Sequence, residues 1–286
     1  MKKIAFAAAL ATACVAAPAV ADVVIIPQAA LLPTLQLYTA NFGTLMVTTG
    51  GINNPNIGSP TGRNDDGFRG PINFGFTLAN FFGASYSSFY LNNNGNISFN
   101  DGLSAFTPTG PQGATVPVIS PFFADVDTRG ANSGLVYYNL STANQAVLTW
   151  DHVGYYNSNS NLLDTFQLVV RGADYNVPTG EGQIGFFWTT MQWETGDASN
   201  GQGGFGGTPA AVGFGDGQSN GFVLEGSTEN GISRAVQNHY IWFNLNQRGE
   251  PTPVPSIPEP ETYALMAAGL AALGVVSRRR QKRSAA

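Results

Sequence analysis

Two aspartates one residue apart, Asp125 and Asp127, have the side chains and spacing that most directly suggest chemistry. In an extended strand, side chains two positions apart point to the same face and lie roughly 7 Å apart. Two carboxylates held so close repel each other, and a hard cation such as Ca²⁺ would relieve that repulsion. The pair therefore predicts a calcium site, completed by asparagine or backbone oxygens. The alternative is a solvated strand end in which Asp127 caps the turn or pairs with Arg129.

A second acidic pair, Asp65 and Asp66, lies between Asn64 and Gly67 and is a similar candidate for holding a cation. A turn is its alternative, because asparagine, aspartate and glycine all favour turns. An EF-hand is excluded at the first pair, since the twelfth position of that loop requires glutamate and is here Val136. No other cofactor is predicted.

The sequence motifs predict no catalytic residue. Residues 217–221 match the G-x-S-x-G pattern of a nucleophile elbow. That elbow needs a helix after the serine, whereas the apolar residues 222–224 predict a strand. The motif is therefore expected to be a hairpin turn.

Alternating apolar residues predict the strands that must position these side chains. Residues 72–78 and 166–170 are apolar at every second position, which is typical of half-buried strands. Residues 184–188 are apolar on both faces and predict a central strand, and residues 240–245 predict a late one. Residues 93–95, Asn-Asn-Gly, favour a hairpin turn because these residues tolerate positive φ.

Composition extends this interpretation to the whole body of the chain. The sequence has 35 glycines and 19 phenylalanines and no sustained helical period. The predicted fold class is all-β: a single antiparallel β-sandwich of roughly ten to twelve strands. Large aromatic residues are expected to fill its core; they are Trp150, Phe166, Trp188 and Trp193.

The N-terminus predicts export. Two lysines precede an apolar stretch over residues 4–15, and Ala19 and Ala21 frame an A-x-A cleavage site. We therefore expect a signal helix that signal peptidase removes. The only cysteine, Cys14, would leave with it, so the mature chain would contain no disulfide and no thiolate metal site.

The C-terminus carries a three-part signal. An apolar stretch over residues 263–277 predicts a helix of about 20 Å, short of the ~30 Å hydrocarbon core of a bilayer. The flanking polar residues are Pro258, Glu259 and Pro260 before it, and a basic cluster over residues 278–283 that begins Arg278, Arg279, Arg280. Together they resemble the PEP-CTERM sorting signal of Gram-negative bacteria, which implies handling by an exosortase. An ordinary short membrane anchor is the alternative.

These features divide the chain into five predicted segments. They are a signal peptide (1–21), a lead-in with an edge strand as its alternative (22–36), the sandwich (37–248), a proline-rich polyproline-II linker (249–257) and the sorting signal (258–283). Between residues 22 and 257 there are six arginines, no lysine and sixteen acidic residues, a formal charge near −10. Nucleic acid is therefore excluded as a partner, because its binding needs a basic surface.

Six sequence blocks of the body, in order, resemble the NIDO domain, the extracellular domain first named in nidogen. They are LNNNGNISF (91–99), ISPFFADVDTR (119–129), LTWDHVGYY (148–156), DTFQLV (164–169), MQWETG (191–196) and AVGF (211–214). The family usually has asparagine where this chain has Asp164. The resemblance, over roughly residues 65–230, implies an extracellular β domain associated with cell–matrix adhesion, and it brings no catalytic residues.

We therefore expect an exported, non-enzymatic cell-surface or matrix protein that contributes to adhesion or to biofilm and exopolysaccharide structure. Its expected partners are signal peptidase and exosortase during export, then exopolysaccharide or a matrix protein, with membrane contact through residues 263–277. One alternative is a glycan-binding module in which Tyr155 and Tyr156 stack on sugar rings. A second is a matrix-polymer hydrolase that uses Asp151 and Glu194 as a carboxylate pair.

Overall fold

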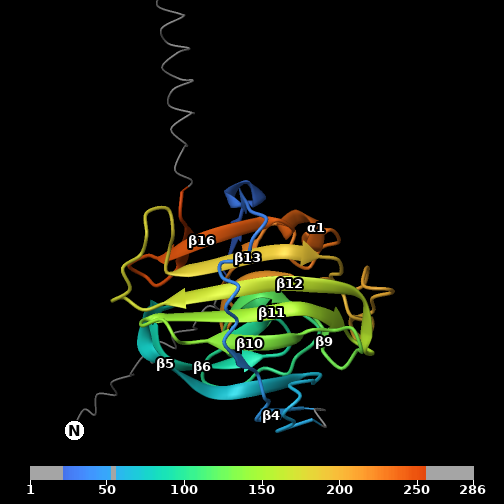
Figure 1. Cartoon of the computed structure of the whole chain (residues 1–286). Coiled ribbons are helices and arrows are strands. Elements are labelled where there is room, and N and C mark those ends of the chain that lie inside the picture. The colour runs from blue at the N-terminus through green and yellow to red at the C-terminus, as the bar shows by residue number, and fades with distance from the viewer. Residues whose placement is uncertain (1–21, 53–55, 256–286) are drawn as a thin grey trace, which may run out of the picture.

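The computed structural model describes residues 22–52 and 56–255, and two β-sheets dominate these residues (Figure 1). Sheet A contains, in spatial order, β1 (Val23–Ile26), β15 (Gly221–Leu224), β14 (Ala211–Asp216), β8 (Pro117–Phe123), β7 (Asn96–Ser98), β6 (Ala84–Asn92), β5 (Gly67–Phe81) and β4 (Gly50–Gly51). Sheet B contains β17 (Pro251–Pro253), β16 (His239–Leu245), β13 (Ile184–Met191), β12 (Asn159–Arg171), β11 (Gln145–Tyr155), β10 (Leu135–Asn139) and β3 (Thr44–Leu45). Two further strands join sheet B at its side: β2 (Leu32–Pro33) pairs with β16, and β9 (Val126–Asp127) pairs with β11.

Helical structure in the described chain is short. The one α-helix there is α1 (Ile232–Val236), and three-residue 3₁₀ turns occur at Gln28–Ala30, Pro111–Gly113 and Asp197–Ser199. The predicted all-β class is thus confirmed. The pairings between described strands are antiparallel except for β1 with β15.

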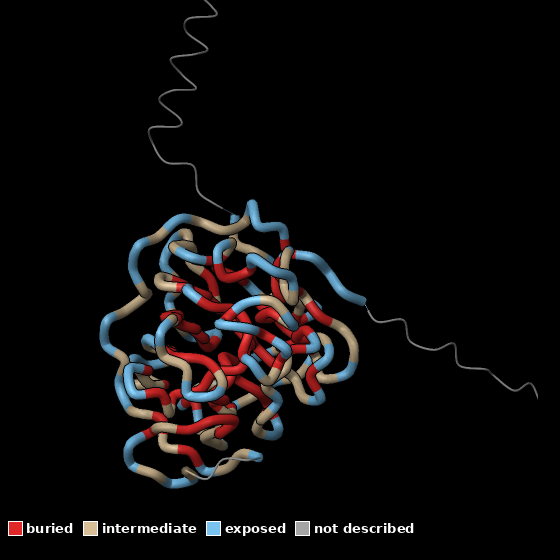
Figure 2. Tube along the Cα trace, turned by 90° about the vertical axis from the view of Figure 1, so that its right-hand side faces the viewer, coloured by how far each residue is buried: buried red, intermediate tan, exposed pale blue. Residues whose placement is uncertain are grey.

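The core lies between the two sheets, where the buried residues concentrate (Figure 2). Phe186 of β13 stacks on Phe214 of β14, with ring centroids 5.1 Å apart, so side chains of sheet B meet those of sheet A directly. The indole Nε1 of Trp188 also crosses the interface and donates to the carbonyl of Pro121 at 3.0 Å. The aromatic residues predicted for the core are all fully buried.

The predicted strands and turns are found where alternation or turn chemistry is clear. Residues 72–78 lie in β5, 166–170 in β12 and 240–245 in β16. Residues 184–188 lie in β13 and are buried throughout, as expected for a strand covered on both faces. The G-x-S-x-G motif is the hairpin between β14 and β15, so the nucleophile-elbow alternative is wrong.

The described residues contain seventeen strands, more than the ten to twelve predicted. Most of the excess comes from strands of two residues, namely β2, β3, β4 and β9. Two residues are too few to show an alternation, so no sequence pattern marks such strands.

The sandwich is wider than its predicted boundaries at both ends. The lead-in contributes β1, which pairs parallel with β15, and β2, which pairs with β16. The described part of the proline-rich linker is also corrected, because β17 pairs antiparallel with β16 instead of forming a free polyproline spacer. Its prolines are tolerated because β17 is an edge strand, where a missing N–H costs no ladder hydrogen bond.

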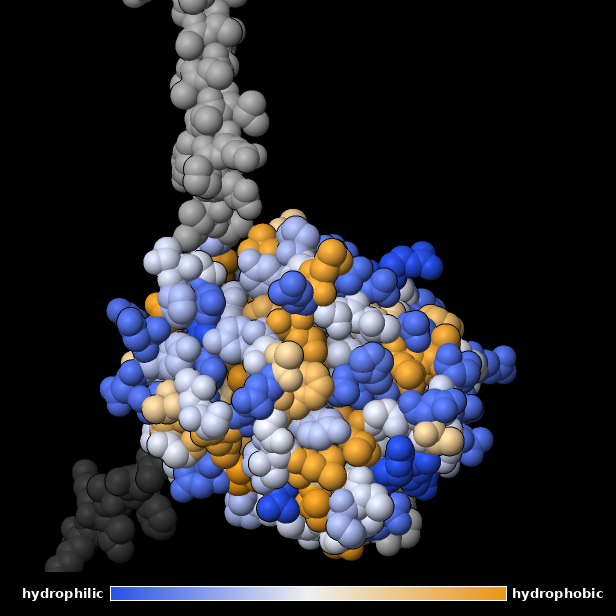
Figure 3. All heavy atoms as spheres, viewed as in Figure 1, coloured by the Kyte–Doolittle hydropathy of each residue, from blue (hydrophilic) through white to orange (hydrophobic). Residues whose placement is uncertain are grey.

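The segment between β2 and β3, residues 34–43, crosses the outer face of sheet B as a strap (Figure 1). Leu37 and Tyr38 of the strap pack on an apolar cluster of that face. Figure 3 shows apolar residues along this face. Gln167 of β12 fixes the strap by accepting from the N–H of Thr39 at 3.1 Å and donating to its carbonyl at 2.8 Å.

The predicted signal helix with Ala19 and Ala21, and the apolar helix 263–277 with its flanking motif, lie outside the described residues. Within residues 22–52 and 56–255, no helix is long and apolar enough to cross a membrane.

Candidate functional site

Two segments about sixty residues apart form one corner of the sandwich. Asp65 and Asp66 immediately precede β5, and Asp125 lies between β8 and β9. Asp65 and Asp127 form an antiparallel β-bridge, and the N–H of Thr128 donates to the carbonyl of Asn64 at 3.1 Å. These backbone contacts bring the two acidic pairs of the sequence together.

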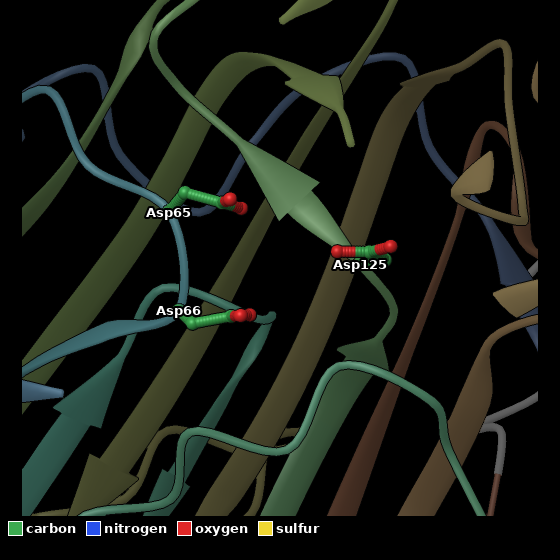
Figure 4. A group of neighbouring side chains, drawn as sticks. All are labelled: Asp65, Asp66 and Asp125. Carbon is green, nitrogen blue, oxygen red and sulfur yellow. The ribbon is translucent and has the colours of Figure 1, made fainter. Parts of the chain in front are cut away.

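Asp65, Asp66 and Asp125 converge on one point (Figure 4). Each offers a carboxylate oxygen, and these three oxygens lie within 4.8 Å of one another. The residues are buried, with exposed fractions of 5%, 6% and 1% respectively. We call these three residues the aspartate cluster.

The oxygens of the cluster differ in their hydrogen bonding. Asp66 Oδ1 accepts from Asn94 Nδ2 at 2.8 Å, and Asp65 Oδ2 pairs with Arg129 Nη2 at 2.7 Å. Both oxygens of Asp125, and Oδ1 of Asp65, have no hydrogen-bond partner among the described residues. A neighbouring amide oxygen, Asn93 Oδ1, is likewise buried and without a partner there.

Burial and mutual repulsion dominate the electrostatics of the cluster. Burial, with a smaller contribution from the charges of Asp66 and Asp65, raises the pKa of Asp125 from 3.8 to about 9. Burial is also the main reason that the pKa of Asp65 rises to about 7 and that of Asp66 to about 6. The charge of Arg129 lowers both of these, but it does not cancel the cost of burying carboxylates side by side.

Asp127, predicted as the partner of Asp125, serves another purpose. Its Oδ1 accepts from the backbone N and the Nε of Arg129, and its Oδ2 accepts from Arg129 Nη2 and from the N–H of Ser158. Asp127 therefore pairs with Arg129, as the alternative to a calcium site predicted. The shared-face prediction was wrong because Asp125 lies outside both β8 and β9, so strand geometry does not relate the two side chains.

The predicted glycan-contacting pair is also changed by the structure. Tyr155 is only 1% exposed: its ring packs against Trp193, with centroids 5.5 Å apart, and its hydroxyl bonds Asn161. A ring in the core cannot stack on a sugar, so Tyr155 is removed from the prediction. Tyr156 is half-buried and keeps an accessible side chain.

Asp151 and Glu194, the carboxylate pair of the hydrolase alternative, each form hydrogen bonds to nearby groups of the fold. Asp151 bonds the neighbouring His152 ring at 2.6 Å. Glu194 is buried and accepts hydrogen bonds from the N–H of Gly231 and from the N–H and hydroxyl of Ser233, at the start of α1.

Asp164, where the NIDO family usually has asparagine, is fully buried. Its Oδ1 accepts from the N–H groups of Gln192 and Trp193 at 2.6 and 3.1 Å, while its Oδ2 has no partner among the described residues. Burial raises the pKa of Asp164 well above 3.8, with the charge of Glu194 adding to the effect. Burial therefore favours the uncharged form of Asp164, at a position where the family usually has an uncharged amide.

The outer face of sheet B carries a groove that no sequence motif predicts. The groove has a volume of about 780 Å³ and lies beside the strap, with aromatic lining from Tyr38, Phe187, Tyr240 and Trp242. Residues 240–243 are apolar or aromatic on both faces of β16, but only the path of the strap decides which rings stay accessible.

The fold and this corner together define a two-sheet, all-β domain with a buried cluster of aspartates. Comparison with known families agrees: residues 87–250 match the nidogen-like domain, and residues 256–281 match the PEP-CTERM protein-sorting motif. The chain belongs to the nidogen-like domain family. The six predicted sorting residues all fall within the matched motif, which indicates exosortase processing and export to the cell surface or extracellular space.

Similar curated proteins are alpha-tectorins. The protein from Mus musculus is 32% identical over 194 residues, which is 57% of this chain and 8% of that protein. The protein from Gallus gallus is 31% identical over 193 residues, 57% of this chain and 9% of that protein. The chain thus spans less than a tenth of the length of these relatives. No solved structure matches the chain.

Proposed function

We propose that this protein is a non-enzymatic module that exosortase delivers to the cell surface or matrix. There it contributes to cell–matrix adhesion or to biofilm and exopolysaccharide structure. The observation that carries the proposal is the joining, in one chain, of a nidogen-like domain and a PEP-CTERM sorting motif. The first is an adhesion-type extracellular module, and the second is a sorting signal for export.

The chemistry of the described residues supports a structural role. Asp125 is 1% exposed, so a polymer cannot reach its carboxylate. Glu194 is fully engaged at the start of α1, and Asp127 is engaged by Arg129. The acidic body also suits a protein that must stay soluble outside the cell.

Gene deletion tests the adhesive role. Deletion should reduce surface attachment and alter matrix composition, and the full chain should restore both. The matched control is a chain that ends at Ile257, which keeps the sandwich and loses the sorting signal. This control should be made but should fail to restore attachment. Unchanged attachment and matrix composition after deletion would refute the proposal.

Mass spectrometry tests the processing step separately. The protein recovered from the medium should end near Glu259, whereas a chain ending at Ala286 would show that the tail is retained. We propose removal of the tail, because the motif match, residues 256–281, includes part or all of each of the three parts of the signal.

Glycan binding is a second candidate function, and the aromatic groove favours it. Tyr240 stacks on Phe187 at 5.4 Å with nearly parallel rings, and Tyr240 itself is half-buried. Such a platform can pack against the apolar face of a sugar. Glu181 and Gln36 add polar groups at its rim.

Retention on the organism's purified exopolysaccharide tests this candidate. Tyr240→Ala should abolish retention, while Tyr156→Ala should leave it unchanged. If only Tyr156→Ala lost retention, the sugar contact would be made by Tyr156, as the sequence predicts, and not by the groove. If the unmodified protein is not retained, glycan binding is refuted while the adhesive role stands.

A further inference from the structure

We propose that Asp65, Asp66 and Asp125 form a Ca²⁺ site that ties together the segments before β5 and β9. This inference goes beyond the proposed function and does not depend on it. It rests on the geometry of the aspartate cluster and on the absence of partners for its most buried oxygens.

The spacing of the three carboxylates fits one ion. Calcium binds oxygen ligands at about 2.3–2.6 Å, so two ligands on one ion lie at most about 5 Å apart. The three cluster oxygens lie within 4.8 Å of one another. They come from two segments that face each other, so an ion between them can contact both (Figure 4).

The unpartnered oxygens point to a ligand independently of this spacing. Asp125 is 99% buried, and neither of its oxygens has a partner among the described residues. Burying a carboxylate without a partner is costly, so such a group usually binds a cation or is neutralised. The nearest guanidinium, that of Arg129, is already bound to Asp127 and to Oδ2 of Asp65. Oδ1 of Asp65 is also buried and has no hydrogen-bond partner among the described residues.

One further oxygen, that of the Asn93 side chain, is a candidate to complete the shell. Asn93 Oδ1 is buried and has no partner among the described residues, because the amide nitrogen of that side chain is the group bonded to Val126. Asn93 lies on the β6–β7 hairpin, next to Asn94, which bonds Asp66. An ion would therefore also stabilise this hairpin.

The ligand chemistry favours calcium over other cations. Carboxylates and amide oxygens are hard ligands, so they do not suit the softer metals that prefer sulfur or imidazole. Magnesium keeps several waters and usually takes one or two carboxylates, whereas calcium accepts a larger and less regular set of oxygens. Extracellular calcium modules have dissociation constants of roughly 10⁻⁴–10⁻³ M, and we expect a value in that range or below.

The test uses the full chain, purified in mild detergent and freed of metal with a chelator. Adding Ca²⁺ at about one hundred times its dissociation constant should raise the Tm by roughly 5–10 °C. Terbium provides a direct probe, because the indole Nε1 of Trp150 donates to the carbonyl of Asn93 at 2.9 Å. Excitation of this ring should produce Tb³⁺ luminescence that Ca²⁺ competes away.

Asp125→Asn keeps the size of the side chain and removes its charge, and it should weaken Ca²⁺ binding at least tenfold. The matched control is Asp174→Asn, an exposed aspartate after β12, which should behave like the unmodified protein. Asp66→Asn should also weaken binding, and it replaces Asp125→Asn if that variant does not fold.

Two outcomes would overturn the inference. The first is an unmodified protein that shows neither a Tm shift with Ca²⁺ nor sensitised Tb³⁺ luminescence. The second is equal binding by Asp125→Asn, Asp66→Asn and Asp174→Asn, which would place the ion elsewhere. A Tm that rises with Mg²⁺ but not with Ca²⁺ would refute the choice of ion.

Discussion

Gly196 packs directly against Asp125: a Cβ at position 196 would lie 2.4 Å from both the Cβ and the Oδ2 of the aspartate. The backbone φ of Gly196 is −78°, a value that any residue adopts, so the requirement for glycine is steric. The aspartate cluster is therefore shaped by a residue that contributes no ligand.

Gly196→Ala should push the Asp125 carboxylate away from Asp65 and Asp66. Overpacking of this kind typically lowers the free energy of unfolding by about 1–3 kcal/mol. Urea unfolding measures that loss, and Tb³⁺ luminescence should report weaker binding in the same variant. Unchanged stability together with unchanged luminescence would contradict the close packing.

Asp164→Asn should stabilise the protein at neutral pH. Because the pKa of Asp164 in the folded state lies well above 3.8, the unfolded chain loses its proton first as the pH rises. Asp164 therefore makes its full contribution to the free energy of unfolding below about pH 4. That contribution falls as the pH rises toward the pKa of Asp164 in the folded state. The slope is up to about 1.4 kcal/mol per pH unit.

Urea unfolding of both proteins between pH 4.5 and about 8 checks this prediction. The variant should gain stability relative to the unmodified protein as the pH rises, because its amide keeps an oxygen for Gln192 and Trp193 and has no proton to lose. The difference in stability between the two proteins isolates Asp164, because both proteins contain all the other titrating groups, including Glu194, whose charge acts on Asp164. A pH-independent difference would show that Asp164 is ionised in the folded protein.

Arg171→Met should destabilise the sandwich by about 3–5 kcal/mol. The guanidinium is fully buried, donates to the carbonyl of Gly182 at 2.9 Å and lies 4.3 Å from the centroid of Trp242. It also holds the strap, because its Nη2 donates to the hydroxyl of Tyr38 at 3.0 Å. Methionine fills the space but leaves these acceptors unpaired.

Denaturant unfolding measures this loss, with Arg248→Met as the control. Arg248 is exposed, so its replacement should change stability by less than about 0.5 kcal/mol. Proteolysis within residues 34–43 should also accelerate in Arg171→Met alone. Equal stabilities of the two variants would show that the strap does not depend on Arg171.

Glu194→Gln should cost about 1–3 kcal/mol, because an amide supplies one acceptor oxygen where the carboxylate supplies two. Both oxygens of Glu194 accept from Gly231, and Oε2 also accepts from Ser233. Thermal unfolding checks this, with the exposed Glu229→Gln as control. A variant as stable as the control would leave Glu194 free for another role.

The strands and hairpins with clear local patterns followed from the sequence alone. Alternation in residues 72–78 and 166–170 depends on the two-residue period of a strand, and Asn93-Asn94-Gly95 depends on turn chemistry. A Cβ on Gly95 would lie 1.8 Å from the carbonyl of Phe122, so glycine there also serves a distant contact that local chemistry does not reveal. The PEP-CTERM motif is equally local, which is why the sequence identifies it.

Tertiary structure alone decided the candidate site. Asp65 and Asp125 are sixty positions apart, and the β-bridge between Asp65 and Asp127, with the hydrogen bond from Thr128 to Asn64, brings their segments together. A contact between two other distant segments packs Tyr155 against Trp193. Local patterns describe which face of a strand a residue occupies, whereas convergence of carboxylates depends on pairings between segments that no short-range periodicity records.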